Sequence, residues 1–288
     1  MRWRSALGAA GTALTLLVLP PWWALAQTQS TNPEKLPVVS EIGSPPGVDV
    51  SGVEWMQVSS PDVGVLVAAV ARPSGSGPFP SVLVLHGSHG FAQEYVRLAR
   101  DIADGGLIGI AACWFQGGGG AGSRFITPIS CPQAPPVPPP FSPEAMRTID
   151  ALVHAARTLP GVRADRIGLF GHSRGGGAAL AYLLGRDSIQ AVVLNSSGYS
   201  RNASELAAQA KAPILMLHGT ADSPEDGGAP ATNVQMARDF EAKLREAGKP
   251  VEAVYYEGGR HNDIFKNETQ RSDEIQRMTR FFRRYLSE

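Results

Sequence analysis

Residues 166–179 of this chain read RIGLFGHSRGGGAA, which places a glycine-flanked serine between an apolar run and the start of a helical pattern. The residues from Gly171 to Gly175 match G-x-S-x-G, the motif of a sharp strand-to-helix turn that exposes a serine hydroxyl at the carboxyl edge of a sheet. The motif alone is weak, but its position directly between a strand and a helix makes it specific. We therefore predict that Ser173 is a nucleophile.

Short apolar runs alternate with helical patterns on both sides of this motif. Most runs are continuous, as expected for strands buried on both faces of a parallel sheet. This alternation predicts an α/β fold with a mainly parallel central sheet and helices on both faces. The expected strands are residues 63–70, 80–86, 107–113, 166–170, 191–195, 213–218 and 251–256. The expected helices are residues 95–104, 142–158, 178–184, 233–246 and 272–285.

The N-terminal residues have the pattern of an export signal. Two arginines precede a charge-free apolar run, and Ala24-Leu25-Ala26 supplies the small residues that a signal peptidase reads, so we expect cleavage before Gln27. The alternative is an uncleaved membrane anchor, against which Pro20-Pro21 and the short apolar run argue. The predicted organisation is a signal peptide at 1–26, a polar, proline-rich linker at 27–48 and one catalytic domain at 49–288. After cleavage of the signal peptide, we expect a secreted or periplasmic protein without a stable membrane anchor.

The composition limits the partners and the covalent links of the chain. Its 288 residues include 26 Lys and Arg and 26 Asp and Glu, so there is no basic field to hold nucleic acid. Cys113 and Cys131 could form a disulfide in an oxidising compartment, or Cys113 could be a small buried residue at the end of a strand. The sequence leaves both readings open, and neither cysteine has a metal-ligand spacing.

A serine nucleophile needs a base, and six histidines are available. His261 lies in the glycine-rich stretch GGRHND, after the last expected strand and before the last expected helix. That loop reaches the same sheet edge as the strand-to-helix turn that carries Ser173, which is called the nucleophile elbow. We therefore predict that His261 is the base. His89 is a minor candidate, while His86, His172 and His218 lie in or beside buried strands and are expected to be structural.

A carboxylate must fix the tautomer of the base and stabilise the imidazolium that forms. Asp222 lies four residues after the strand that ends at His218, and it gives the chain order Ser, Asp, His. Glu225 and Asp226 are rivals further along the same loop. We predict that Asp222 orients His261.

The tetrahedral oxyanion requires backbone N–H donors. The stretch HGSHG follows the expected strand 80–86, and one of its N–H groups should join that of Arg174. Ser88 is the first choice for this donor and His89 the second. The side chain of Arg174 either contacts the substrate or pairs with an acid.

The walls of a substrate pocket are harder to identify from the sequence. Residues 116–142 form a long glycine- and proline-rich connection, which is either a pocket wall or a disordered insertion. Trp114, Phe115 and Tyr199 are candidate pocket residues, although ordinary core packing is the somewhat stronger reading for them.

From about Val50 onward the chain resembles the dienelactone hydrolase-like branch of the α/β-hydrolase superfamily. The resemblance rests on LVLHGSHG, GLFGHSRGGGAA, ILMLHGTAD and YYEGGRH, in that order and spacing. It implies hydrolysis of carboxylic esters or lactones through an acyl-enzyme, without a metal or an organic cofactor. Dienelactone hydrolases proper carry a cysteine where this chain has Ser173, and an acidic residue where it has Gly87. The chain resembles a serine variant of the branch.

The leading hypothesis is therefore a secreted serine esterase that acts on a small-molecule ester. An acyltransferase or a peptidase on the same fold is one alternative, and a non-catalytic binding protein on a hydrolase scaffold is another. All three residues of the expected triad are present, which argues against the binding protein. A metallohydrolase finds no support, because the sequence has no His-x-His or His-Glu-x-x-His cluster.

Overall fold

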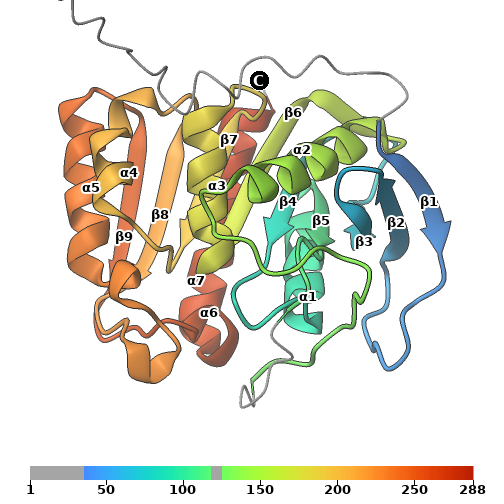
Figure 1. The fold of residues 1–288 in the computed structure, drawn as a ribbon, viewed down its shortest axis with the longest axis horizontal. Coiled ribbons are helices and arrows are strands. Elements are labelled where there is room, and N and C mark those ends of the chain that lie inside the picture. The colour runs from blue at the N-terminus through green and yellow to red at the C-terminus, as the bar shows by residue number, and fades with distance from the viewer. Residues whose placement is uncertain (1–35, 118–124, 288) are drawn as a thin grey trace, which may run out of the picture. The chain divides into compact units, whose positions relative to one another are not determined.

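The computed structural model describes residues 36–117 and 125–287, and within them nine strands form a single sheet (Figure 1). The order across the sheet is β1-β2-β3-β5-β4-β6-β7-β8-β9. The six strands from β5 to β9 in this order are parallel, and β1, β2 and β3 pair antiparallel at one side. The strands are β1 Val38–Ile42, β2 Glu54–Ser60, β3 Gly64–Ala71, β4 Phe79–Leu85, β5 Ile108–Ala112, β6 Val162–His172, β7 Ala191–Asn195, β8 Ile214–Gly219 and β9 Val251–Tyr256.

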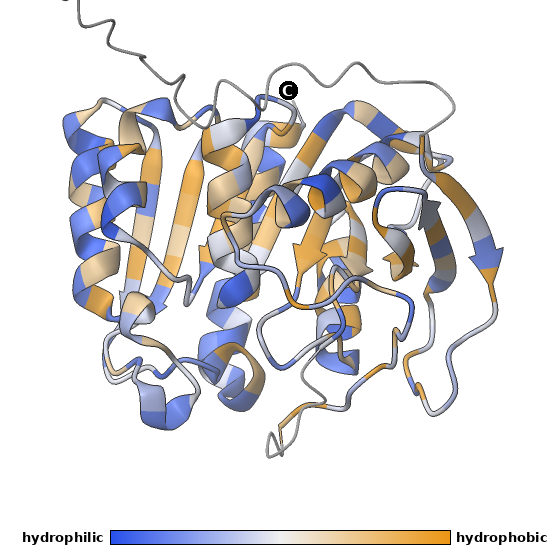
Figure 2. Ribbon diagram, viewed as in Figure 1, coloured by the Kyte–Doolittle hydropathy of each residue, from blue (hydrophilic) through white to orange (hydrophobic). Residues whose placement is uncertain are grey.

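Helices cover both faces of the sheet, as the sequence predicts. Helices α1 and α7 pack against one face, and α2, α3 and α5 pack against the other (Figure 1). Figure 2 shows that the central strands are hydrophobic along most of their length, whereas the outer helix α5 is largely hydrophilic. The helices are α1 Gln93–Asp104, α2 Pro143–Thr158, α3 Arg174–Gly185, α4 Arg201–Glu205, α5 Val234–Glu246, α6 Asp263–Lys266 and α7 Glu268–Leu286, with short 3-10 turns at Ala207–Gln209, Pro224–Asp226 and Pro230–Thr232.

Side-chain caps explain where several helices begin. Ser142 accepts the backbone N–H of Ala145 at 3.2 Å, and proline occupies the first position of α2, so this helix starts as predicted. Asn267 caps α7 by accepting the N–H of Gln270 at 3.1 Å. This cap starts α7 four residues before the predicted helix 272–285.

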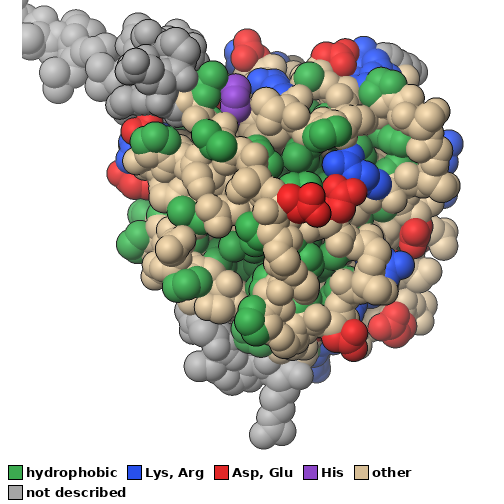
Figure 3. All heavy atoms as spheres, turned by 90° about the vertical axis from the view of Figure 1, so that its right-hand side faces the viewer, with side chains coloured by type: hydrophobic (Ala, Val, Ile, Leu, Met, Phe, Trp, Pro, Cys, Tyr) green, Lys and Arg blue, Asp and Glu red, His purple; other side chains and the backbone are tan. Residues whose placement is uncertain are grey.

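The predicted linker at 27–48 is wrong for part of its length. Residues 1–35, which include the predicted signal peptide, lie outside the described residues. From residue 38, however, strand β1 pairs antiparallel with β2 and adds an edge to the sheet. The side chains of β1 are exposed or half-buried, with Val38 65% exposed, so the strand lacks the continuous apolar run expected of a buried strand. Seen from this side, the surface mixes apolar, acidic and basic groups (Figure 3).

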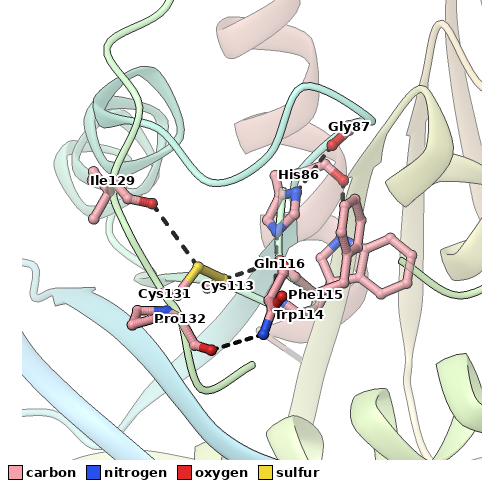
Figure 4. Close-up of a disulfide and its surroundings, with 9 residues drawn as sticks. All are labelled: His86, Gly87, Cys113, Trp114, Phe115, Gln116, Ile129, Cys131 and Pro132. Carbon is pink, nitrogen blue, oxygen red and sulfur yellow. Dashed lines mark hydrogen bonds between the residues drawn. A yellow bond between two sulfur atoms is a disulfide. The ribbon is translucent and has the colours of Figure 1, made fainter. Parts of the chain in front are cut away.

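The proline-rich segment is packed onto the domain wherever the structure describes it. Cys113, just after β5, forms a disulfide with Cys131, which settles the question that the sequence leaves open (Figure 4). The side-chain amide of Gln116 donates to the carbonyl of Pro132 at 2.7 Å, and the N–H of Ile129 donates to the carbonyl of Phe91 at 2.9 Å. Residues 125–141 are therefore a fixed strap and not a disordered insertion, while residues 118–124 lie outside the described part.

In the part of the chain that the structure describes, no helix combines the length and the hydropathy that a membrane span requires.

We predict that replacing both cysteines, Cys113→Ala with Cys131→Ala, lowers the free energy of unfolding. The disulfide closes a separation of 18 residues, and the chain-entropy model gives a loss of about 3 kcal/mol for a loop of this size. Urea denaturation of the oxidised wild type and the double variant measures the difference. Wild-type protein treated with a reductant is the control and should match the variant. Equal midpoints in all three samples would contradict the prediction.

Candidate active site

Ser173 lies at the turn between β6 and α3, with a backbone φ of 54°. This left-handed conformation is unfavourable for a residue with a side chain and is typical of a nucleophile elbow. The turn is tight because β6 and α3 nearly touch, and a Cβ on Gly171 would clash with the carbonyl of Gly175. Helix α3 also lies against the end of β4, where a Cβ on Gly175 would lie 2.7 Å from the carbonyl oxygen of His86. The sequence prediction of an elbow is confirmed in its geometry.

His261 reaches Ser173 from the loop after β9. Its Nε2 lies 2.9 Å from Oγ of Ser173, and both side chains are buried. The loop bends back at Gly258, whose φ of 69° suits glycine. The structure thus brings together the first two of the three residues predicted as a triad.

Asp222 completes the chain of contacts on the other side of the imidazole. Its Oδ2 lies 2.7 Å from Nδ1 of His261, and the hydroxyl of Thr232 donates to its Oδ1 at 2.8 Å. An ionised carboxylate only accepts hydrogen bonds, so Nδ1 of His261 carries the proton and Nε2 is left as an acceptor for the serine hydroxyl. This tautomer allows His261 to take a proton from Ser173.

The rival carboxylates have other partners. Asp226 accepts the backbone N–H of Asn262 at 3.3 Å and pairs with Lys266 at 2.6 Å, so it anchors the loop that carries His261. Glu225 is exposed in the 3-10 turn Pro224–Asp226.

The loop after β4 lies against the nucleophile. A Cβ on Gly87 would lie 3.3 Å from Cβ of Ser173, and the N–H of Gly87 already donates to the hydroxyl of Tyr95 at 2.8 Å. The N–H of Arg174 belongs to the first turn of α3, where N–H groups have no partner inside the helix. An oxyanion at Ser173 would meet the positive end of the α3 dipole there. The next N–H of the loop, that of Ser88, stays the predicted second donor.

The side chain of Arg174 links this loop to the strap. Its Nε donates to Oγ of Ser88 at 3.1 Å, and its Nη1 donates to the carbonyl of Pro138 at 3.0 Å. The sequence leaves open whether Arg174 meets the substrate or an acid. In the structure its guanidinium holds the 86–90 loop and residues 125–141 together beside the nucleophile.

The remaining predicted structural histidines are kept neutral by burial. Burial lowers the pKa of His86 to about 3, and its Nε2 accepts the N–H of Trp114 at 3.3 Å. Burial also lowers the pKa of His218, which donates to the carbonyl of Thr232 at 2.6 Å. His89, the minor candidate for the base, has its pKa lowered to about 4 by burial and contacts the hydroxyl of Tyr95 at 2.7 Å. Its ring does not replace His261 at Ser173.

The three aromatic residues that were candidates for pocket lining are core residues, as the stronger interpretation of the sequence predicts. Trp114, Phe115 and Tyr199 are fully buried. The indole N–H of Trp114 donates to the carbonyl of His86 at 2.9 Å, which ties the ends of β5 and β4 together (Figure 4). Trp114 and Phe115 pack against His86 at the end of β4, whereas Tyr199 packs against His218 and Phe240.

Sequence reasoning missed several residues that support the site, namely Thr232, Asn195, Asn262 and Glu274. Two of them have a signal in the sequence. Asn195 is a polar residue at the end of the apolar strand AVVLN, and Glu274 falls between Gln270 and Met278 on the buried face of α7. Thr232 lies in the 3-10 turn Pro230–Thr232 and has no such signal.

The comparisons with known proteins identify the family. The model of the dienelactone hydrolase family matches residues 66–286, which is most of the chain.

The chain belongs to the dienelactone hydrolase family. A protein of Methylorubrum extorquens that carries the name carboxymethylenebutenolidase is 26% identical over 223 residues, covering 74% of this chain and 73% of that protein. This family membership indicates hydrolase or esterase activity.

Solved structures share the fold of this family member. An esterase of Pyrococcus furiosus superposes with a TM-score of 0.64 at 15% identity, covering 85% of this chain and all (100%) of that one. A dienelactone hydrolase-like promiscuous phosphotriesterase from metagenomic libraries gives 0.63 at 16% identity, covering 82% of this chain and 99% of that one. The family member therefore has the α/β-hydrolase fold, as the sequence predicts.

Among the described residues, no group of three or more His, Cys, Asp or Glu side chains is arranged to hold a metal ion.

We predict opposite effects for two glycine substitutions in helix α3. Gly175→Ala places a methyl group against the backbone carbonyls of Leu85 and His86, so it should lower the free energy of unfolding by about 2–3 kcal/mol, as overpacking does. Gly185→Ala, at the other end of the helix, meets open space and should raise it by about 0.5 kcal/mol. Urea denaturation of both variants measures the two changes in the free energy of unfolding. Equal midpoints for the two variants would contradict the close contact of Gly175 with the end of β4.

Proposed function

We propose that this protein is a serine esterase that cleaves carboxylic esters or lactones through an acyl-enzyme on Ser173. The observation that carries the proposal is the continuous chain of contacts from Ser173 through His261 to Asp222, at 2.9 Å and 2.7 Å. Nucleophile, base and orienting carboxylate in hydrogen-bonding contact form the arrangement that activates a serine.

The first half of the reaction forms the acyl-enzyme. His261 Nε2 removes the proton of Ser173 as Oγ attacks the ester carbonyl carbon, and Asp222 stabilises the imidazolium that results. The oxyanion faces the N–H groups of Arg174 and Ser88. A donor of this kind typically stabilises the transition state by about 3 kcal/mol. When the carbon–oxygen bond breaks, His261 returns its proton to the leaving alcohol.

The second half releases the acid. Water enters, His261 takes one of its protons, and the resulting hydroxide attacks the acyl carbonyl carbon. Collapse of the second tetrahedral intermediate returns the proton to Ser173 and frees the carboxylic acid. Each proton transfer in the two half-reactions passes through His261.

We further propose that the mature protein acts outside the cytoplasm on a small-molecule ester, without a nucleic-acid partner. The export-like N-terminal sequence supports this location. The Cys113–Cys131 disulfide supports it as well, because disulfides persist in oxidising compartments.

Ser173→Ala tests the nucleophile. We expect kcat/KM on p-nitrophenyl acetate to fall by about 10⁴- to 10⁶-fold, because no other group replaces the attacking oxygen. A fluorophosphonate probe should label Ser173 in the wild type, with the site found by mass spectrometry, and should label nothing in the variant. Ser204→Ala, in helix α4, is the control and should keep both properties. Wild-type rates for Ser173→Ala would refute the mechanism.

Asp222→Asn tests the orienting carboxylate. An amide at this position can donate to Nδ1 of His261 and so favours the tautomer with its proton on Nε2, which cannot accept from Ser173. We expect kcat/KM to fall by about 10⁴-fold, the loss known for this change in a serine protease. Circular dichroism should show an unchanged fold. A loss below about tenfold would assign the role to another carboxylate.

A further inference from the structure

A chain of buried polar side chains runs behind the nucleophile elbow. Glu274 of α7 accepts the side-chain amide of Asn195 at 2.8 Å, and Oδ1 of Asn195 lies 2.7 Å from Nδ1 of His172. Nε2 of His172 lies 3.2 Å from Oδ1 of Asn262. All four side chains are buried. This row of side chains links helix α7 to His172, which precedes Ser173, and to Asn262, which follows His261.

Both ring nitrogens of His172 face amide oxygens. The orientation of each amide follows from its other partner, because Nδ2 of Asn195 donates to Glu274 and Nδ2 of Asn262 donates to the carbonyl of Asp226 at 2.6 Å. A neutral imidazole has a single N–H to donate. Two hydrogen bonds from the His172 ring to amide oxygens need two ring protons, but a neutral histidine has one. If Glu274 is ionised, the network therefore lacks one proton.

That proton has two possible positions. It can sit on His172, which then donates from both nitrogens while Glu274 is ionised. It can instead sit on Glu274, which donates to Oδ1 of a reversed Asn195, whose Nδ2 then donates to Nδ1 of His172. In both arrangements Nε2–H of His172 donates to Asn262, and the network as a whole is neutral. A net charge at this depth would be costly.

The acid–base properties of the two groups agree with a shared proton. Burial raises the pKa of Glu274 to about 8, and burial lowers the pKa of His172. Glu274 can thus keep a proton at neutral pH that an exposed glutamate would have lost.

The network holds the nucleophile and the base at the same time. The backbone N–H of Ser173 donates to the carbonyl oxygen of Asn195 at 3.0 Å, which helps to fix the left-handed elbow. Asn262 is the neighbour of His261, so its bond to His172 fixes the loop that carries the base.

We propose that Glu274, Asn195, His172 and Asn262 form a positioning network that carries one shared proton and keeps His261 aligned with Ser173. This inference rests on the proposed esterase function. Once the proton is lost, His172 keeps a single N–H, and one of its two nitrogens must face an amide oxygen without a hydrogen between them. The contact to Asn262, or the contact to Asn195, then becomes repulsive, and the alignment of His261 weakens.

Other titratable groups surround the network and belong in the interpretation of any pH profile. The groups around it are His89, Asp226, Tyr256, His261, Asp263, Lys266 and Asp273.

Glu274→Gln tests the proposal through the pH profile of kcat. A glutamine imitates the protonated glutamate, since its amide can donate to Asn195 at every pH. We expect wild-type kcat on p-nitrophenyl acetate to fall about tenfold at alkaline pH as the single proton is lost. The variant should lack this alkaline limb, with KM unchanged. Glu268→Gln, exposed on the same helix, is the control and should keep the limb. An alkaline limb in Glu274→Gln equal to that of the wild type would overturn the proposal.

Stability provides a readout that does not need activity. Glu274 has a folded-state pKa above that of an unfolded glutamate, so its contribution to wild-type stability is lost as pH rises from about 4.5 toward about 8. The thermal midpoint of Glu274→Gln relative to wild type should therefore rise with pH across this window, and that of Glu268→Gln should not. Parallel curves for Glu274→Gln and wild type would contradict the shared proton.

The wild-type protein provides a third measurement in case the buried substitution prevents folding. With ¹⁵N-labelled histidine, two-bond ¹⁵N–¹H correlation spectra report which ring nitrogens carry protons. We expect Nε2 of His172 to be protonated at neutral pH and its ring signals to change at the pH of the alkaline limb. An unprotonated Nε2 at neutral pH would refute the network. If wild-type protein has no esterase activity but His172 behaves as expected, the proposed function fails and the proton assignment stands.

Discussion

The backbone of Ser173 is the constraint from which the site follows. Its φ of 54° turns the chain so sharply that β6 and α3 lie against each other at Gly171 and Gly175. Such a conformation persists only where the surroundings over-determine it. Here those surroundings include the bond from its N–H to Asn195 and the parallel pairing of β6 with both β4 and β7. The serine hydroxyl is therefore directed by the sheet itself and not by a mobile loop.

The partners of Ser173 come from other strand ends at the same sheet edge, and burial determines how they act. Asp222 accepts from both Thr232 and His261, and both Asp222 and His261 are buried, so the imidazole is held in one orientation. Burial lowers the pKa of His86 and of His218, so these two histidines stay neutral and do not compete as cations for Asp222. One carboxylate and one imidazole can thus act as a pair, with the cationic side chain of Arg174 turned to the strap instead.

The sequence predicts the buried part of this structure well and the exposed part poorly. Continuous apolar runs such as AVVLN identify the parallel strands, and GHSRG between two elements identifies the elbow, because both signals arise from local packing. Strand β1 is missed since an exposed edge strand carries no such signal. The contact of Asn262 with His172 joins residues 90 positions apart, and the pairing of Cys113 with Cys131 depends on the path of a loop. Neither can be derived from local pattern, because both are set by the tertiary fold.

The strand order has a consequence for how the chain reaches its native state. In the sheet, Ser81 of β4 pairs with Ile108 of β5 on one side and with Ile167 of β6 on the other, so the central strand gains its second partner only when the much later strand β6 has been made. High contact order of this kind slows folding. A nascent polypeptide with only its first half outside the ribosome therefore cannot close the middle of its sheet until strand β6 emerges.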